Sequence, residues 1–466
     1  MRKLLFTIAA ILMVVTSSAA PKVETSVKHK IKDGRVILQT PKRQPGQESA
    51  LLMTCDPIEN VRVGFIGLGM RGKGAVYRFT YIEGTETVAL CDLEQSYVDR
   101  AQKTLVSKGK AKAAEYVGED AWKELCQRDD IDLVYICTPW QVHVEMAVYA
   151  MEHGKHVALE VPAAMSIAEC WQLVDTSERT RRHCMMLENC CYDFFEMTTL
   201  NMAQHGLFGE IVHVEGGYIH NLDPFWKQYH NNWRLEYNQA HRGDVYPTHG
   251  IGPVCQILNI HRGDKMDFLV SMDTDSFHGK EVAKAQLGSD EFANGDHTVT
   301  LIRTAKGKQI EIQHNVYTRR PYDRLFEITG VDGYACKYPV EGFALKTENL
   351  AQESMDYQNL DGEKFVSGQI KSELMKKYRH PIVAEIEAQA RKVGGHGGMD
   401  YIMDYRLIYC LRNGLPLDQD VYDAAEWSCL TELSGISILY GSMPVEVPDF
   451  TRGEWDKVKG YKHAVK

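Results

Sequence analysis

Short apolar runs rich in β-branched residues recur through the first half of the chain, and segments with helical periodicity separate them. The strand-like runs lie at 61–66, 86–90, 131–137, 155–160 and 184–188. The segments with helical spacing lie at 96–106, 119–127, 142–152 and 166–179, and Ser166 is placed to cap the last of them. This alternation is typical of α/β proteins. We predict a doubly wound parallel sheet covered by helices, a Rossmann domain, over residues 59–195.

The pattern changes after residue 200. Loose alternation at 211–220 and strand-like runs at 299–303, 309–313 and 326–330 favour antiparallel hairpins. Helical periodicity returns at 373–391, 399–413 and 421–440. We therefore predict an α+β substrate domain with an open, mostly antiparallel sheet at 196–395, then C-terminal helices at 396–466 that pack back on the core. The polar stretch 21–58 predicts an extended N-terminal arm.

The beginning of the chain has the pattern of a secretory signal. Met1-Arg2-Lys3 is basic, residues 4–15 are apolar, and 18–20 are small. We predict a signal peptide at 1–20 and an exported protein, periplasmic or secreted; an uncleaved anchor is the alternative. Because no other run is long and apolar enough to span a bilayer, we expect no membrane span in the mature chain.

Composition narrows the class of protein further. The chain has 466 residues, 44% of them hydrophobic and 25% charged, as in soluble globular proteins. A formal net charge of −10 argues against nucleic acid as a partner. The twelve cysteines show neither a CxxC pair nor a metal-binding spacing, so we predict no metal site and expect buried free thiols in the strands, as at Cys91, Cys137 and Cys184.

A glycine triad follows the first strand of the predicted parallel sheet. Gly67 would make a tight turn, Gly69 would let a pyrophosphate approach the backbone, and Gly72 would let the next helix pack on the strand. The second strand leads to Asp92, the expected place for a carboxylate that holds a ribose hydroxyl. An acid there favours NAD over NADP, because it would repel a 2′-phosphate. The simpler alternative is a doubly wound domain whose turn binds no nucleotide.

Further candidates lie where the parallel strands end, since ligands of such sheets bind beyond the carboxyl ends of the strands. The segments are 138–143, which contains Trp140 and His143, then 160–162, which contains Glu160, and finally Asn189. We expect them to converge on the nicotinamide and its ribose. An ordinary loop or capping role is the alternative, most of all for Trp140 and His143.

The second half of the chain supplies candidates for acid–base chemistry. His249 stands at a glycine-rich helix start after Tyr246, a context that suits a proton-transferring histidine. The segment 223–234 is dense in aromatics and amides, which stack on sugars and bond their hydroxyls; a loop over the sheet is the equal alternative. Tyr322 lies on a turn, with Tyr317 as the fallback. The glycine-rich segment 394–398 is either a lid edge or, more simply, a linker.

The domain order and the motifs at 67–72, 138–139 and 160–162 resemble the glucose–fructose oxidoreductase/inositol dehydrogenase (Gfo/Idh/MocA) superfamily. Ordinary members carry Glu-Lys-Pro where this chain has Glu160-Val161-Pro162, and that lysine helps to deprotonate a substrate hydroxyl. They also carry an aspartate four residues before the catalytic histidine, where this chain has Val245, with Asp244 displaced by one. These departures argue against a simple dehydrogenase cycle.

The detailed motifs are more similar to one branch, glycoside hydrolase family 109, the NAD-dependent α-N-acetylgalactosaminidases. The matching stretches are 67–72, 140–143, 160–161, 246–250, 320–322 and 395–400. The resemblance implies a cofactor site for NAD and a sugar site with two acid–base residues. Around NAD it implies Gly67, Gly69, Met70, Arg71, Gly72, Asp92, Trp140, Gln141, Val142, His143, Glu160, Val161 and Asn189. Around the sugar it implies Tyr192, Tyr218, Arg234 and Tyr246, with His249 and Tyr322 as the acid–base residues.

The resemblance implies a glycosidase that removes terminal α-N-acetylgalactosamine from glycans. In such a cycle NAD⁺ oxidises C3 of the sugar, the acidified C2 proton is removed, the anomeric group leaves, water adds, and the hydride returns with net retention. Two alternatives stay open: an NAD-dependent sugar dehydrogenase with net hydride transfer, and a non-catalytic nucleotide-binding protein. A homodimer is also expected, because open-sheet second domains often pair face to face.

Overall fold

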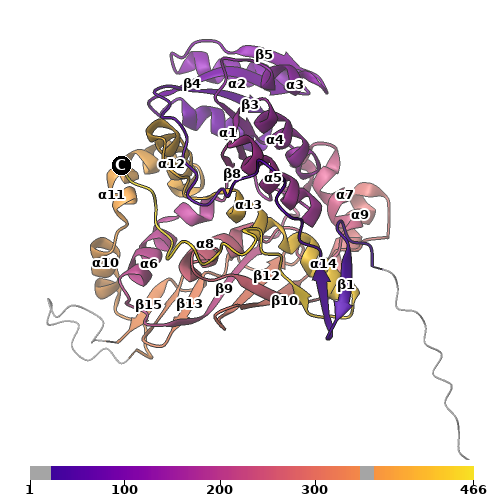
Figure 1. The fold of residues 1–466 in the computed structure, drawn as a ribbon, viewed down its shortest axis with the longest axis vertical. Helices are drawn as coiled ribbons and strands as arrows, with labels where there is room; N and C mark the ends of the chain where they lie inside the picture. Colours follow the sequence, from indigo (N-terminus) through magenta and orange to yellow (C-terminus); the bar gives the residue numbers. More distant parts are fainter. Residues whose placement is uncertain (1–22, 347–361) are drawn as a thin grey trace, which may run out of the picture.

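In the computed structural model, residues 23–346 and 362–466 are described, so the predicted signal peptide lies outside them. The first domain contains a six-stranded, wholly parallel sheet in the order β5-β4-β3-β6-β7-β8. Its strands are β3 (Val61–Ile66), β4 (Thr85–Asp92), β5 (Ala114–Val117), β6 (Leu133–Ile136), β7 (His156–Leu159) and β8 (Cys184–Met186). The predicted doubly wound sheet is confirmed (Figure 1).

The helices of this domain lie close to their predicted positions. They are α1 (Met70–Phe79), α2 (Gln95–Ser107), α3 (Ala121–Cys126), α4 (His143–Glu152) and α5 (Ile167–Thr180). Ser166 caps α5, as predicted, because its hydroxyl accepts a hydrogen bond from the Glu169 N–H. Strand β5 was not predicted, because it is a short edge strand with no fully buried residue and therefore no apolar pattern.

The second sheet has ten strands in the order β1-β2-β16-β10-β11-β12-β9-β13-β14-β15. Those after the first domain are β9 (Ile211–Ile219), β10 (Met266–Asp273), β11 (Thr298–Thr304), β12 (Gln309–Asn315), β13 (Glu327–Gly330), β14 (Gly333–Cys336), β15 (Gly342–Leu345) and β16 (Val445–Glu446). All neighbours are antiparallel except β9 with β12 and β2 with β16. The predicted mostly antiparallel sheet is thus confirmed.

The C-terminal helices join the two sheets. In Figure 1, α8 (Thr248–Leu258) and α14 (Leu430–Leu439) lie between the ten-stranded sheet and the first domain, in contact with β9 and β10 respectively. Helix α13 (Val421–Ser428) packs on α5 and β8, and α12 (Met399–Asn413) packs on α1. The remaining helices are α6 (Phe194–Gln204), α7 (Trp233–Ala240), α9 (His278–Leu287), α10 (Gly368–Lys377) and α11 (Pro381–Val393).

Two predicted helices are in fact pairs. The segment 373–391 divides into α10 and α11, because Pro381 begins a new helix and His380 caps it. The segment 421–440 divides at Cys429 into α13 and α14. Pro381 was a sequence signal for the first break; the second had no such signal, because most residues of α13 and α14 are buried and no periodicity marks their boundary.

The N-terminal arm is more ordered than predicted. Residues His29–Lys32 (β1) and Arg35–Leu38 (β2) form a hairpin at the edge of the ten-stranded sheet. Its turn, Asp33-Gly34, has positive φ at both positions, 51° and 73°, as a tight hairpin turn requires. The prediction of an extended arm was wrong here, although an Asp-Gly turn signal was present.

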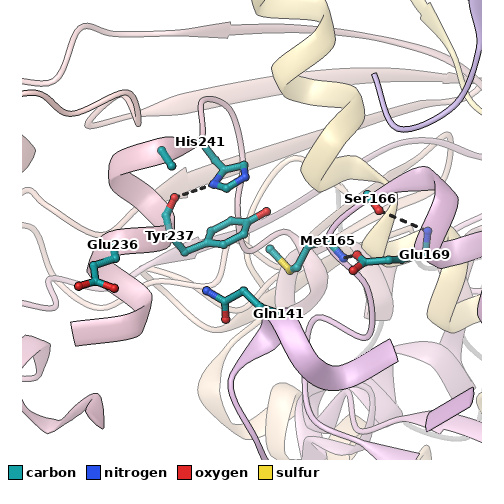
Figure 2. Close-up of a pocket in the computed structure, with 8 residues that line it drawn as sticks. Gln141, Met165, Ser166, Glu169, Glu236, Tyr237 and His241 are labelled. Carbon is teal, nitrogen blue, oxygen red and sulfur yellow. Dashed lines mark hydrogen bonds between the residues drawn. The ribbon is translucent and has the colours of Figure 1, made fainter. Parts of the chain in front are cut away.

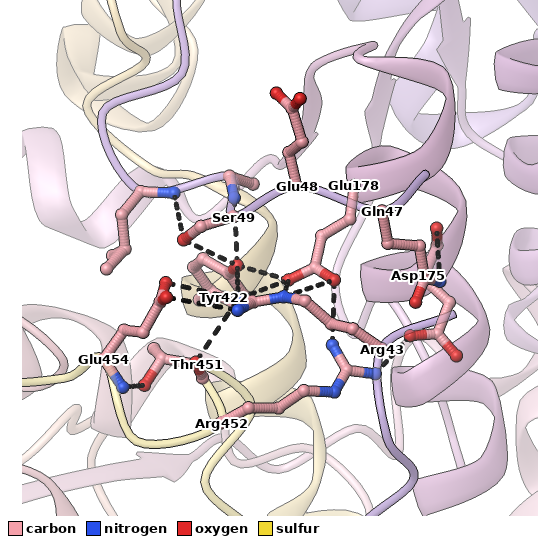
Figure 3. Close-up of polar contacts among 12 residues, drawn as sticks. Arg43, Gln47, Glu48, Ser49, Asp175, Glu178, Tyr422, Thr451, Arg452 and Glu454 are labelled. Atoms are coloured by element: carbon pink, nitrogen blue, oxygen red, sulfur yellow. Dashed lines mark hydrogen bonds and ion pairs between the residues drawn. The ribbon is translucent and has the colours of Figure 1, made fainter. Parts of the chain in front are cut away.

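Beyond this hairpin a buried polar network holds the arm to the first domain (Figure 3). The carboxylate of Glu178, in α5, is fully buried and accepts hydrogen bonds from Arg43, Tyr422 and Arg452. Arg43 also pairs with Glu454. A buried carboxylate is stable only when paired in this way, so the network ties the arm, α5 and the C-terminal segment together.

Two further expectations concern the whole described chain. All twelve cysteines are free, and ten of them are buried; of the three thiols expected to be buried in strands, Cys91 and Cys184 are, whereas Cys137 follows β6 and is only partly buried. Among residues 23–346 and 362–466, the structure has no helix with the length and apolar character needed to cross a bilayer.

Candidate active site

A cavity of about 950 Å³ is lined on one side by the carboxyl ends of the parallel strands and on the other by residues of the second domain. It brings together most of the residues singled out from the sequence. Those on its wall are Gly67, Gly69, Met70, Arg71, Asp92, Trp140, Val142, His143, Glu160, Val161, Asn189, Tyr218, Arg234, Tyr246, His249 and Tyr322. Three others, Gly72, Gln141 and Tyr192, lie outside it.

The glycine loop has the shape that a dinucleotide needs. Gly67 has φ +85°, and a Cβ there would lie 2.7 Å from the Cys137 backbone. A Cβ on Gly72 would lie 1.8 Å from the carbonyl oxygen of Gly67, so this glycine lets α1 pack against the turn, as predicted. Gly69 has no atom within 4 Å of such a Cβ and leaves the cavity wall open beside the α1 N-terminus, where unpaired N–H groups can face a pyrophosphate.

The carboxylate of Asp92 braces this loop from the end of β4. Its Oδ2 accepts from the Leu68 N–H at 2.6 Å and its Oδ1 from the Glu94 N–H at 3.1 Å. Each carboxylate oxygen has a second acceptor position, so ribose hydroxyls can still donate to it. The loop and Asp92 together therefore fit an NAD molecule.

An ion-pair network lies at the part of the cavity wall that contains Arg71 and Glu160. Arg71 pairs with Glu160 at 2.9 Å and with Asp400 at 3.4 Å. Burial opposes ionisation of Asp400, but the Arg71 guanidinium outweighs it and holds the pKa of that carboxyl well below its usual range. Asn189 donates to Asp400 at 2.5 Å, so one acid on α12 orients two residues of the predicted cofactor site.

The segment 138–143 forms part of the cavity wall and holds neighbouring loops of the cavity together. Trp140 donates its indole N–H to the Val161 carbonyl at 3.1 Å and stacks on Tyr246 with ring centroids 5.5 Å apart. His143 is buried, and its two ring nitrogens lie 2.9 and 2.8 Å from the carbonyls of Pro162 and Thr138. The ring of His143 therefore holds two loops of the cavity together, which is the structural role kept as its alternative.

Gln141 does not face the cavity. It lines a separate pocket of about 450 Å³, with Met165, Glu169, Tyr237 and His241 (Figure 2). The resemblance implies Gln141 around NAD, but its side chain lines this other pocket, because the short 3-10 helix Trp140–Val142 turns successive side chains to different sides.

His249 is the most constrained group of the cavity, at 9% exposure in the first turn of α8. Its Nδ1 lies 2.7 and 2.9 Å from the two carboxylate oxygens of Glu188, and its Nε2 lies 3.1 Å from the Tyr246 hydroxyl. Burial lowers the pKa of His249 to about 4, although Glu188 acts in the opposite direction. The imidazole is therefore neutral at pH 7 and able to accept a proton.

Arg234 and the aromatic segment form the opposite wall. Its guanidinium is fully enclosed, 4.9 Å from the Trp140 ring and 4.4 Å from the Tyr246 ring. It donates to the Tyr229 hydroxyl at 2.8 Å, while its Nε and Nη2 have no partner among the described residues. Buried donors without partners are costly, so this guanidinium is suited to bond the oxygens of a ligand. The segment 223–234 thus lines the cavity rather than merely covering the sheet.

The choice left open between two tyrosines is decided by their positions. Tyr322 is 41% exposed on the cavity wall, and its hydroxyl accepts from the Arg324 guanidinium, which also donates to Cys190 Sγ. Tyr317 is buried outside the cavity, stacked on Trp226 at 5.8 Å. Of these two tyrosines, only Tyr322 lines the cavity.

Tyr192 is the second correction. Its side chain is fully buried, and its hydroxyl donates to Asp418 at 3.5 Å, away from the cavity. It lies in a short helical turn, Asn189–Tyr192, where only the first residue faces the cavity. The resemblance implies a place for Tyr192 around the sugar, but this turn directs its side chain into the core.

Two charged groups near the cavity, Glu188 and Arg324, were not predicted from the sequence. Glu188 is the last residue of a predicted strand, and Arg324 follows Tyr322 by two residues. His396, in the glycine-rich segment for which a lid edge and a linker were the alternatives, lines the cavity and pairs with Asp400 at 2.9 Å. Each of these residues becomes visible as part of a site only through contacts with distant parts of the chain.

Glu188, Cys190 and His249 have ligand atoms within 4.8 Å of one another, a spacing that could in principle hold a metal ion. The Arg324 guanidinium, however, donates to Cys190 Sγ and brings a positive charge to that position. A second cluster, His261, Asp420 and Asp423, is likewise paired with an arginine, Arg262. Both arrangements favour an ion-pair network over a cation site.

Comparison with known proteins divides the chain into the same two domains as the structure does. Residues 61–188 match the family described as "Oxidoreductase family, NAD-binding Rossmann fold", and residues 192–457 match "Glycosyl hydrolase 109, C-terminal domain". The fold is similar to that of levoglucosan dehydrogenase in complex with NADH and levoglucosan, with a TM-score of 0.62 at 18% identity over 84% of this chain and 100% of that one. Myo-inositol 2-dehydrogenase from Lactobacillus plantarum has a TM-score of 0.58 at 15% identity, over 84% and 100%.

Relatives of similar sequence carry the hydrolase family name. Glycosyl hydrolase family 109 protein 1 of Bacteroides thetaiotaomicron is 59% identical over 441 residues, 94% of each chain. A glycosyl hydrolase family 109 protein of Porphyromonas gingivalis is 60% identical over 432 residues, 92% of each chain. The chain is therefore a member of glycosyl hydrolase family 109, built on the NAD-binding fold of the Gfo/Idh/MocA oxidoreductases.

Proposed function

We propose that this protein hydrolyses terminal α-linked N-acetylgalactosamine from glycans, with NAD as a retained cofactor and with retention at the anomeric carbon. The observation that carries the proposal is the chemistry of the cavity wall on the second-domain side. Among the described residues there, the wall holds histidine, tyrosine and arginine but no aspartate or glutamate. Direct glycoside hydrolysis needs two carboxyl groups about 5–9.5 Å apart on either side of the bond.

A cavity of this kind suits proton transfer beside a hydride acceptor. Bound NAD⁺ would supply reversible oxidation of a sugar carbon, which acidifies the neighbouring C–H. In this proposal the neutral His249 accepts a proton at Nε2, and Tyr322 exchanges a proton with the leaving or entering oxygen. Arg234 and the rings of Trp140 and Tyr246 hold the sugar, and Val161 leaves no lysine to complete an ordinary dehydrogenase site.

The test is release of p-nitrophenol from p-nitrophenyl α-N-acetylgalactosaminide by the purified protein, with NADH absorbance followed in the same cuvette. We expect release without net NADH, and exchange of the sugar C2 hydrogen with solvent deuterium. If NADH instead accumulates in proportion to the substrate consumed, the protein is a sugar dehydrogenase. No release from any α- or β-glycoside would refute the glycosidase proposal.

We also propose export through the predicted signal peptide, to the periplasm or outside the cell. The face of the ten-stranded sheet turned away from the helices in Figure 1 is open, and a homodimer through it stays a prediction. Cell fractionation and light scattering would test these two proposals separately.

A further inference from the structure

We propose that Glu188 is the positioning residue of the acid–base centre: it holds one tautomer and one orientation of His249 and balances the charge that the imidazole gains when it accepts a proton. The inference rests on the proposed acid–base role of His249. Glu188 itself does not line the cavity, so it acts through the histidine.

The geometry of the pair is that of a fully enclosed hydrogen bond. Both carboxylate oxygens of Glu188 lie within 2.9 Å of His249 Nδ1, and the Glu188 side chain has no exposed surface. The carboxylate is itself held from the other side, because Oε1 accepts from the Cys190 N–H at 2.9 Å. Its backbone carbonyl accepts from Gln419 at 2.9 Å. Glu188 is therefore a fixed point against which the ring can be oriented.

The charge states determine which nitrogen carries the proton. Burial acts to raise the pKa of Glu188, but the contact with His249 outweighs it and the pKa is lowered, so the carboxylate is ionised at neutral pH. An ionised carboxylate can only accept hydrogen bonds, so Nδ1 must carry the hydrogen. The lone pair of Nε2 then faces the Tyr246 hydroxyl and the cavity, which is the form that can remove a proton from a substrate.

Glu188 supplies a carboxylate beside His249 that the sequence lacks at the position where ordinary members of the superfamily are expected to have one. Ordinary members of the superfamily are expected to carry an aspartate four residues before this histidine, where this chain has Val245. The adjacent Asp244 does not take over that task, since it bonds the Tyr246 backbone N–H at 2.9 Å rather than the imidazole. The carboxylate that contacts His249 comes from the end of the first domain, 61 residues earlier in the chain. The acid–base centre is thus assembled across the boundary between the two domains.

Other charged and titratable groups also face His249. They are Arg324, Cys190, Tyr246 and His396. Arg324 and His396 lower the pKa of the imidazole, and Glu188 is the group that raises it. Removing the negative charge of Glu188 should therefore move the acidic limb of the pH profile of kcat/KM to lower pH.

The test is Glu188→Gln, which keeps the shape and the acceptor for the Cys190 N–H but removes the charge. Its amide can also donate to Nδ1 and select the wrong tautomer. We expect kcat for p-nitrophenol release to fall by about 10²- to 10⁴-fold, with little change in KM, as for loss of an orienting carboxylate in hydrolases of other families. Glu188→Asp should keep part of the activity that Glu188→Gln loses. Aspartate carries the negative charge, but its shorter side chain places that charge farther from Nδ1.

A matched control exists in the same chain. Glu426 lies 2.6 Å from Nδ1 of the buried His261, and neither residue lines the cavity, so Glu426→Gln removes another buried carboxylate–histidine contact outside the site. We expect this control to lower thermal stability and leave the pH profile of the folded enzyme unchanged. Proton NMR of the holoenzyme should show two strongly deshielded histidine N–H signals, one lost in each variant.

The result that would overturn the proposal is a Glu188→Gln protein with wild-type kcat and pH profile, or one whose loss of activity merely follows its loss of folded protein. Retention of the His249 N–H signal in that variant would overturn it as well. Failure of the proposed function is recognised separately, because then the wild-type protein releases no p-nitrophenol. The NMR signals of the Glu188–His249 pair do not depend on activity and would still test the pair.

Discussion

Removal of the Asp92 carboxylate is the most direct test of the cofactor site. It lines the cavity at the end of β4 and is held by the Leu68 and Glu94 N–H groups. Asp92→Ala would remove at least one charge-assisted hydrogen bond to a ribose hydroxyl, worth about 1.5–3 kcal/mol. This corresponds to about a 10- to 150-fold weaker affinity for NAD. It would also remove the acceptor of the Leu68 N–H, whose hydrogen bond holds the glycine loop in place.

The assay is NAD content of the purified protein by chromatography after denaturation, followed by titration calorimetry of NAD and NADP into stripped protein. We expect less retained NAD, and a smaller preference for NAD over NADP because the repulsion of a 2′-phosphate is lost. Asp99→Ala is the control, since Asp99 bonds only Gln95 on an exposed helix surface and does not line the cavity. Unchanged NAD content and affinity in Asp92→Ala would refute the assignment of Asp92 to the ribose.

Three further variants test other parts of the argument. His249→Ala should abolish glycoside cleavage while the protein keeps its NAD; full activity would mean that the acid–base centre is misplaced. Gly72→Ala should give a poorly folded or NAD-free protein by circular dichroism and cofactor content, because its Cβ would lie 1.8 Å from the Gly67 carbonyl oxygen. Burial lowers the pKa of His314 to about 3, below its unfolded value of about 6.5, so its stabilising contribution is complete above pH 6.5 and is lost as pH falls. His314→Leu should therefore reduce the acid sensitivity of the melting temperature by the equivalent of about 2 kcal/mol at pH 5, and an unchanged pH dependence of melting would contradict this.

Most of the fold could be predicted from local patterns in the sequence. Five of the six strands of the parallel sheet, the capped helix α5 and the glycine loop were predicted near their observed bounds, because alternation and capping depend on near neighbours in sequence. Prediction failed where the pattern was weak. The edge strand β5 buries too little, most residues of α13 and α14 are buried so that no periodicity marks their boundary, and the break before α11 is marked only by Pro381.

The candidate site was predicted unevenly for a related reason. A strand end indicates where a ligand lies, and 16 of the residues proposed from the sequence do line one cavity. A strand end does not say which way each following side chain points. Tyr192 therefore turns into the core, Gln141 faces another pocket, and Tyr322 rather than Tyr317 reaches the cavity.

The sequence by itself determined the order of the two domains and the dinucleotide loop, and it singled out His249 but left the choice between Tyr322 and Tyr317 open. Only the tertiary structure decided which acid contacts that histidine, which of the two tyrosines lines the cavity, and that Nε and Nη2 of Arg234 have no partner among the described residues. The physical reason is that hydrophobic period and turn chemistry act over a few residues, whereas the state of a buried proton depends on every charge packed around it. Glu188 and His249 are 61 residues apart, and no local pattern couples them. Their contact exists because α8 of the second domain packs against the turn that follows β8.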